Sequence, residues 1–169
     1  MDDGHSLGLL FGLLFLFLLG SAFFSASETG IMTSNRYRLK HQAKLGNTTA
    51  QRILKLLQQP DRLIGVILIG NNTVNNLAAV VATLIGLQVF GDVGASIAAG
   101  LLTFVMLIFC EVGPKTYAAS HPERIAGFTS YVLLFLLKAF GIINTDLIGI
   151  IFVPLVIFGI GLSLFVNYS

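Results

Sequence analysis

The stretch Ile67-Leu-Ile-Gly-Asn-Asn-Thr-Val-Asn-Asn76 places four asparagines and a glycine in a segment otherwise apolar enough to cross a bilayer. Carboxamides in hydrocarbon are costly unless something binds them, so this cluster is a candidate functional site. Two more polar clusters interrupt apolar runs: Ser25-Ala-Ser-Glu28 ends the first run, and Glu111-Val-Gly-Pro-Lys115 ends the third. The pattern predicts an all-α membrane protein whose helices share one polar site.

Composition supports a protein solvated largely by lipid. Of the 169 residues, 55% are hydrophobic and only 11% are charged, with a mean hydropathy of +0.87; soluble domains carry about 25% charged residues. A bilayer span needs about 20 apolar residues, which predicts spans at about 7–33, 63–89 and 94–117. Cys110 is the single cysteine, so no internal disulfide forms, and we interpret it as a small buried hydrophobe.

The basic residues predict the orientation in the membrane. Seven of the ten lie between the first and second apolar runs: Arg36, Arg38, Lys40, Lys44, Arg52, Lys55 and Arg62. By the positive-inside rule the N-terminus lies outside, and segment 35–61 forms a pair of amphipathic helices at the cytoplasmic interface. Aromatic residues are not interleaved with these charges, which argues against nucleic-acid binding.

The last part of the chain has two possible arrangements. Residues 122–166 form either a juxtamembrane helical belt, with the C-terminus inside, or a fourth span, with the C-terminus outside. No internal repeat of the kind found in inverted-repeat transporters is visible, so any pseudo-symmetry is expected to come from a homodimer.

Each predicted span carries one polar stripe at helical spacing. The stripes are Ser21, Ser25 and Glu28; Asn71 and Asn75, beside Asn72 and Asn76; and Glu111, Lys115 and Ala118. They lie at similar depths from the cytoplasmic end, which predicts that they meet. Hydroxyl, carboxamide and carboxylate oxygens suit hard cations such as Mg²⁺, Ca²⁺, Na⁺ or Mn²⁺. The three histidines fall in the tail and connections, so no zinc or copper site is predicted.

Some polar residues also have structural explanations. Hydroxyls can bond back to carbonyls of their own helix, which would account for Ser21 and Ser27. Carboxamides can join neighbouring helices without binding an ion, which would account for Asn72 and Asn76.

The two carboxylates have an alternative role as well. Glu28 and Glu111 could each pair with a lysine or arginine near the interface. Lys115 would compete with a cation for Glu111, which is useful where an ion must leave as well as enter.

Three ordered motifs resemble the transmembrane domain of the CorC/CNNM magnesium transporters. They are Phe23-Phe-Ser-Ala-Ser-Glu-Thr29, Ile67-Leu-Ile-Gly-Asn-Asn-Thr-Val-Asn75 and Glu111-Val-Gly-Pro-Lys-Thr116, followed by His121-Pro-Glu-Arg124. The resemblance implies a homodimer of three-span protomers with a cytoplasmic helix pair and a juxtamembrane belt. It implies Mg²⁺ export coupled to Na⁺ entry, with a largely dehydrated Mg²⁺ held by Ser25, Asn75 and Glu111. Asn71 would lie close by, the Ala118 carbonyl would be a further ligand, and cytoplasmic CBS domains would follow in the full-length protein.

The predicted function is therefore magnesium transport across the cell membrane by a multi-pass protein. The predicted metal ligands are Ser25, Asn71, Asn75, Glu111 and Ala118, supported by Ser21, Ser27, Glu28, Asn72 and Lys115. A membrane Mg²⁺ sensor that binds without transporting is the main alternative, and a scaffold whose polar stripes serve only dimer packing is another. The sequence has no nucleophile–base pair or phosphate loop, which argues against an enzyme.

Overall fold

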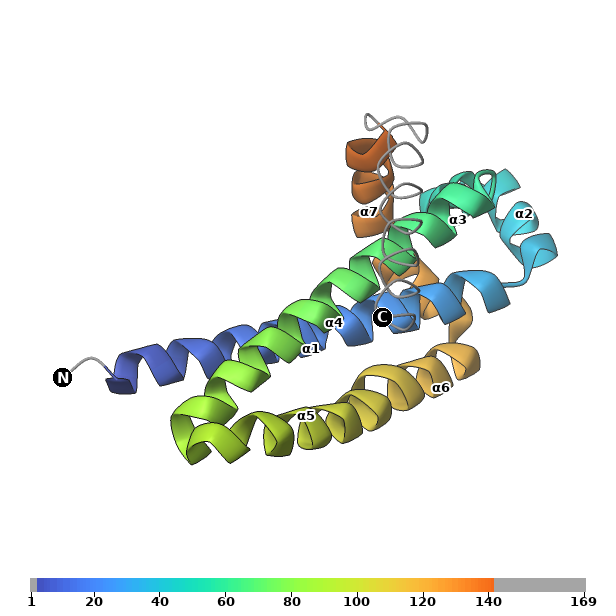
Figure 1. Ribbon diagram of the computed structural model, residues 1–169. Coiled ribbons are helices and arrows are strands. Elements are labelled where there is room, and N and C mark those ends of the chain that lie inside the picture. The colour runs from blue at the N-terminus through green and yellow to red at the C-terminus, as the bar shows by residue number, and fades with distance from the viewer. Residues whose placement is uncertain (1–2, 142–169) are drawn as a thin grey trace, which may run out of the picture. The chain divides into compact units, whose positions relative to one another are not determined.

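The computed structural model describes residues 3–141, and nearly all of them are helical (Figure 1). This confirms the all-α class for that part of the chain. The helices are α1 (Asp3–Thr33), α2 (Arg36–Lys44), α3 (Thr48–Leu56), α4 (Pro60–Phe90), η1 (Gly91–Val93), α5 (Gly94–Val105), η2 (Met106–Val112), α6 (Gly113–Ser120) and α7 (Pro122–Gly141). The predicted belt or fourth span continues to residue 166, and its part from residue 142 onward lies outside the described residues.

The chain divides into two compact units, Met1–Leu134 and Phe135–Ser169. All packing contacts described below lie in the first unit. Of the second unit, the structure describes only the last turns of α7, as far as Gly141.

The longest helices, α1 and α4, pack against each other in opposite directions (Figure 1). Two close approaches fix their register. A Cβ atom added to Gly20 would lie 3.3 Å from Cγ1 of Val74, and one added to Gly70 would overlap the ring of Phe24. Residue 20 therefore faces 74 while residue 24 faces 70, which makes the helices antiparallel.

Within residues 3–141, two helical stretches are long and apolar enough to cross a membrane, Leu7–Thr33 and Pro60–Ser120. The second contains 61 residues. Kept straight, it would be about 90 Å long, roughly three times the hydrocarbon thickness of a bilayer. It turns back at Gly91, whose φ of +65° favours glycine. Just before and after this turn, Gly86 and Gly94 bring the backbones of α4 and α5 into contact, where a Cβ on either would strike the other's carbonyl oxygen.

The predicted third span is not one continuous α-helix. Met106–Val112 forms a π-helix between α5 and α6, in which the Gly113 N–H donates to the Ile108 carbonyl five residues earlier. Pro114 follows directly and has no N–H to donate, so a regular α-helical turn cannot form there. The π-turn accommodates this defect, and it contains Glu111.

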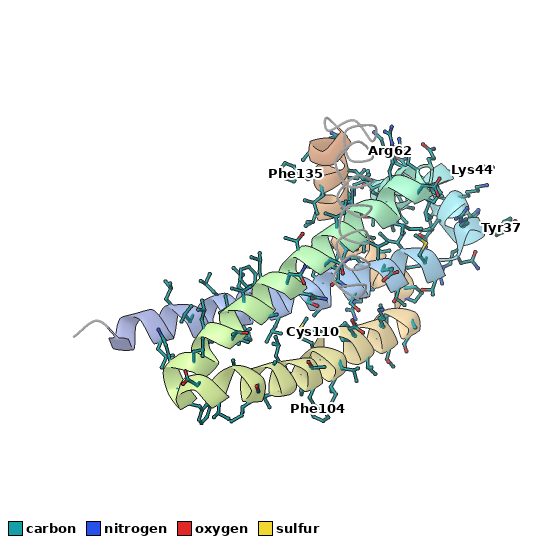
Figure 2. All side chains as sticks on the ribbon, viewed as in Figure 1. Tyr37, Lys44, Arg62, Phe104, Cys110 and Phe135 are labelled. Carbon is teal, nitrogen blue, oxygen red and sulfur yellow. The ribbon has the colours of Figure 1, made fainter. Side chains whose placement is uncertain are left out.

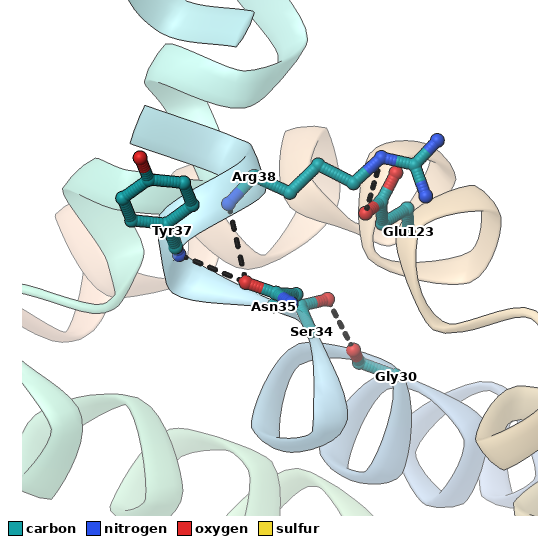
Figure 3. Close-up of polar contacts among 6 residues, drawn as sticks. All are labelled: Gly30, Ser34, Asn35, Tyr37, Arg38 and Glu123. Atoms are coloured by element: carbon teal, nitrogen blue, oxygen red, sulfur yellow. Dashed lines mark hydrogen bonds and ion pairs between the residues drawn. The ribbon is translucent and has the colours of Figure 1, made fainter. Parts of the chain in front are cut away.

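Asparagine side chains start both short helices of the predicted interfacial pair. Asn35 Oδ1 accepts hydrogen bonds from the backbone N–H groups of Tyr37 (3.0 Å) and Arg38 (3.1 Å), as Figure 3 shows. Asn47 Oδ1 does the same for Thr49 and Ala50. Such N-caps satisfy backbone donors that a helix start leaves free, which explains why α2 and α3 begin here.

The start of α4 differs slightly from the prediction. The helix pair is predicted to extend to residue 61, with the next span beginning near residue 63. Instead Pro60 is the first residue of α4. Proline is well accommodated at a first helical position because its missing N–H would have no partner there.

The first turns of α7 pack on α1, α2 and α3. A Cβ on Gly30 would lie 2.8 Å from Ile125 Cγ2, so the bare backbone of α1 makes room for α7. Arg38 Nε lies 3.4 Å from Glu123 Oε1 (Figure 3). The Arg52 guanidinium carbon lies 3.7 Å from the ring centre of Tyr131, a cation–π contact.

Candidate ion-binding site

Three helices meet at a small set of polar side chains, which we call the polar junction: Ser21 on α1, Asn71 on α4 and Cys110 on η2. The Ser21 hydroxyl donates to Asn71 Oδ1 at 3.4 Å. The Cys110 thiol donates to the Leu18 carbonyl on α1, also at 3.4 Å. Figure 2 places Cys110 on the side of its helix that faces α1, with Phe104 on the opposite side. Ser21 is fully buried, so the junction lies inside the helix packing.

The sequence left open whether Ser21 and Ser27 bond back to carbonyls of their own helix. Ser21 could have bonded back to its own helix, but it bonds across to α4. Ser27 does bond back, because its hydroxyl donates to the Phe23 carbonyl at 2.6 Å. Ser27 is fully buried and its hydrogen-bonding capacity is engaged within the helix.

Two oxygens next to the junction are buried without any hydrogen-bond partner among the described residues. They are Ser25 Oγ and Asn75 Oδ1. Ser25 is 2% exposed. An unsatisfied polar group in a protein interior costs about 1–3 kcal/mol, and more where no water can reach it. We call these two atoms the orphan oxygens.

The orphan oxygens lie on opposite sides of the junction. Ser25 follows Ser21 by one turn of α1, and Asn75 follows Asn71 by one turn of α4. Because these helices are antiparallel, the two turns lead in opposite directions. In the register set by Gly20–Val74 and Phe24–Gly70, Asn75 is level with residue 19, so at 1.5 Å per residue Ser25 and Asn75 differ by about 9 Å along the helices. Ser21 and Asn71 share a hydrogen bond, whereas the orphan oxygens of Ser25 and Asn75 share none within residues 3–141.

Glu111 is half-buried and adjoins Cys110 on the π-turn. Its carboxylate takes part in no ion pair within the described residues. Glu28 does: its Oε2 lies 4.0 Å from Lys115 Nζ, which joins α1 to α6. The sequence allowed Lys115 to compete for Glu111, but here the lysine pairs with the other carboxylate.

The other predicted residues lie around this centre. Asn72 and Asn76 are exposed on α4 and join no other helix of the described chain. Ala118 is fully buried near the end of α6, seven residues and about 10 Å beyond Glu111. Its carbonyl has no regular helical donor, because the residue four positions later is Pro122.

Chemistry limits what this site can hold. No group of three or more His, Cys, Asp or Glu side chains gathers anywhere in residues 3–141. The donors near the junction are instead hydroxyl, carboxamide and carboxylate oxygens, which favour hard cations. Among the described residues, Ser25 Oγ and Asn75 Oδ1 have no hydrogen-bond partner and Glu111 has no ion-pair partner, so these oxygens are the most available to an ion.

Cys110 makes a contact with α1 that the sequence did not predict. It was interpreted as a buried hydrophobe, and it is indeed buried at 2% exposure. Its thiol also fixes η2 against the Leu18 carbonyl. The only signal in the sequence was its position directly before Glu111, which did not predict a contact with a backbone atom of another helix.

Comparison with known proteins places this chain in a family. The family model described as "Cyclin M transmembrane N-terminal domain" (CNNM) matches residues 12–165. An Escherichia coli (strain K12) protein named "UPF0053 inner membrane protein YfjD" is 58% identical over 113 residues, covering 67% of this chain and 26% of that protein. A "UPF0053 protein" of Haemophilus influenzae is 49% identical over 138 residues, covering 82% of this chain and 33% of that protein.

A more distant relative carries a name that states a cargo. The "Polyamine export protein" of Salmonella typhimurium is 27% identical over 131 residues, covering 68% of this chain and 28% of that protein. In these three comparisons the chain spans about a quarter to a third of the relative's length.

Proposed function

The chain belongs to the CNNM family of transmembrane domains, and from this premise we propose that it moves Mg²⁺ across the membrane, as an efflux step coupled to Na⁺ entry. Membership establishes a membrane protein, and the names of relatives point to membrane transport. That the transported ion is Mg²⁺, and that Na⁺ entry drives it, is our proposal. The observation that carries it is the pair of orphan oxygens on Ser25 and Asn75, together with a half-buried Glu111 carboxylate that forms no ion pair within residues 3–141.

In the proposed bound state, oxygens of Ser25, Asn71, Asn75 and Glu111 replace water around the ion, with the Ala118 carbonyl as a further ligand. Mg²⁺ takes six oxygens at about 2.1 Å. The stagger of Ser25 and Asn75 therefore calls for a slide of α1 along α4, or for retained water between ion and protein. Such a slide is the movement that would carry an ion from one side of the junction to the other.

The proposed arrangement in the membrane has three crossings by α1, α4 and α5–α6. The N-terminus lies outside, and α2 and α3 lie on the cytoplasmic side, because seven of the ten basic residues fall between Asn35 and Arg62. The fold-back at Gly91 makes the last two crossings antiparallel.

A second copy of the chain is the proposed partner of the exposed face of α4. Asn72 and Asn76 are carboxamides exposed on a membrane-length helix. Facing lipid, they would be costly; facing the same residues of a second protomer, they could hydrogen-bond across an isologous interface. In the whole protein, CBS domains are expected in the cytoplasm.

Export of a polyamine is a second candidate. The supporting observation is the ion pair in which the alkylammonium group of Lys115 sits 4.0 Å from Glu28. A polyamine carries the same alkylammonium chemistry, and two relatives are named for polyamine export. Under this alternative, Glu28 and Glu111 would together hold a cargo with several positive charges.

Flux from proteoliposomes of purified protein tests these possibilities together. The proposal predicts Mg²⁺ release from loaded vesicles that depends on an inward Na⁺ gradient. Spermidine release without Mg²⁺ release would favour the polyamine alternative. Thermal stabilisation by Mg²⁺ without any flux would indicate a sensor, and no response to either cation would leave the polar stripes with a packing role only.

A further inference from the structure

The ion pair between Glu28 and Lys115 has no role yet in the proposed Mg²⁺ site. It is the only ion pair that joins α1 to the helical arm formed by α5, η2 and α6 (residues 94–120) in the described part of the chain. Both side chains are partly exposed, at 38% and 46% respectively, so attraction between them contributes little to stability by itself. A weak pair at this place is better explained by what it does to the neighbouring carboxylate.

Lys115 lies one turn beyond Glu111 on the same helical arm. Side chains four residues apart on a helix are neighbours, and Glu followed by Lys at this spacing is a favourable pair. Lysine has a long flexible stem with a compact charge at its end, so its ammonium group can reach either carboxylate. In the structure it lies on Glu28, and Glu111 stays unpaired.

We infer that Glu28 is a positioning residue that holds Lys115 away from Glu111, so that the Glu111 carboxylate remains free for a cation. The inference rests on the proposed function, because it assumes that Glu111 binds the transported ion. Without Glu28, Lys115 turns to Glu111 and acts as a built-in competitor. With Glu28, the amine remains close enough to return to Glu111 once the ion leaves.

The test is Mg²⁺ affinity in purified full-chain protein, measured by titration calorimetry and by the rise of Tm with Mg²⁺. Glu28→Gln is expected to weaken binding about tenfold, a coupling typical of two linked charged groups. Lys115→Met in the same chain removes the competitor, so the double variant is expected to bind within about twofold of the wild type. A role of Glu28 in folding or in direct ligation would not be rescued in this way.

Two outcomes overturn the inference while leaving the proposed function intact. One is unchanged Mg²⁺ affinity in Glu28→Gln; the other is a double variant as weak as the single one. If Glu28→Gln does not fold, Glu28→Asp keeps the charge but shortens its reach, and it should weaken binding to an intermediate degree that Lys115→Met again restores. Absence of Mg²⁺ binding in the wild type would instead remove the proposed function itself.

Discussion

The polar junction and the α3–α7 contact treat buried polar groups in opposite ways. At the α3–α7 contact, Arg52 donates to the Thr49 hydroxyl at 2.9 Å and stacks on Tyr131. Its Nε lacks a hydrogen-bond partner among the described residues, while its guanidinium carbon lies 3.7 Å from the ring centre of Tyr131. Beside the junction, Ser25 and Asn75 have no such compensation, although they lie on helices of membrane-spanning length.

Some buried polar groups of this chain have partners that stabilise the fold, whereas the orphan oxygens have none among the described residues. Where stability is at stake, this chain provides partners: asparagine caps for α2 and α3, and an aromatic ring for Arg52. Oxygens left unpaired where lipid makes them costly are most simply explained by a ligand that binds them. The two regions should therefore respond differently to mutation.

The largest expected effect is the loss of cation response in Glu111→Gln. Removing one charge of a buried charge pair costs about 2–5 kcal/mol, and about 1.4 kcal/mol corresponds to tenfold in affinity. The rise of Tm with Mg²⁺ should accordingly disappear at millimolar concentrations. Glu123→Gln, which alters the α2–α7 ion pair instead, is the matched control and should keep the full response. A normal response in Glu111→Gln would count against the ion site at the junction.

Gly70→Ala should separate α1 from α4. The added methyl group would overlap the Phe24 ring, and overpacking of this kind costs about 1–3 kcal/mol. Thermal unfolding monitored by circular dichroism would measure the loss. Gly65→Ala on the same helix is the control, because a Cβ there meets nothing within 4 Å. Equal stability of the two variants would contradict the packing register described above.

Ser25→Ala and Ser27→Ala form a matched pair of buried serines two residues apart. Removing the orphan oxygen of Ser25 relieves an unsatisfied group, so metal-free stability should rise by about 1 kcal/mol while Mg²⁺ stabilisation falls. Ser27 already donates within its helix, and its replacement should leave the Mg²⁺ response unchanged. Similar behaviour of both variants would show that the orphan oxygen of Ser25 has no special role.

The smallest expected effect belongs to Tyr131→Leu at the α3–α7 contact. Loss of the cation–π contact should cost about 0.5–1 kcal/mol, with no change in Mg²⁺ affinity. Tyr37→Leu is a suitable control, because Tyr37 is 85% exposed and makes no aromatic contact of this kind. A changed Mg²⁺ affinity in Tyr131→Leu would mean that the two regions are coupled.

Much of the helical layout could be predicted from the sequence. The apolar runs predicted α1, α4 and the helical segment 94–120 to within a few residues. The helix pair predicted at 35–61 is observed as α2 and α3, and Gly46 (φ +87°) lies between them. These features depend on local composition and turn chemistry. The π-turn at Met106–Val112 was missed, because Pro114 indicates a weak point in a helix but not how the backbone resolves it.

The sequence selected polar residues for the candidate site but did not predict their hydrogen-bond and ion-pair partners. Ser21, Asn71 and Glu111 were all selected from their spacing, and the structure does join Ser21 to Asn71. Depth counted from helix ends is accurate only to about a turn, so it could not reveal that Ser25 and Asn75 lie on opposite sides. Nor could it decide which carboxylate receives Lys115, since a long side chain can reach both. The shared ion of Ser25, Asn75 and Glu111 stays a prediction.

The π-turn affects how η2 and α6 contact α1. Cys110 and Lys115 both reach α1, one through the Leu18 carbonyl and the other through Glu28. On a regular α-helix, residues five apart point about 140° away from each other, whereas the i to i+5 pattern of a π-turn brings them toward one side. The wide turn thus reduces the angle between the Cys110 and Lys115 side chains about the helix axis. A regular α-helix with the same number of residues in place of this turn would set Cys110 and Lys115 about 140° apart and turn one of them away from α1, even if every amino acid named at the junction were kept.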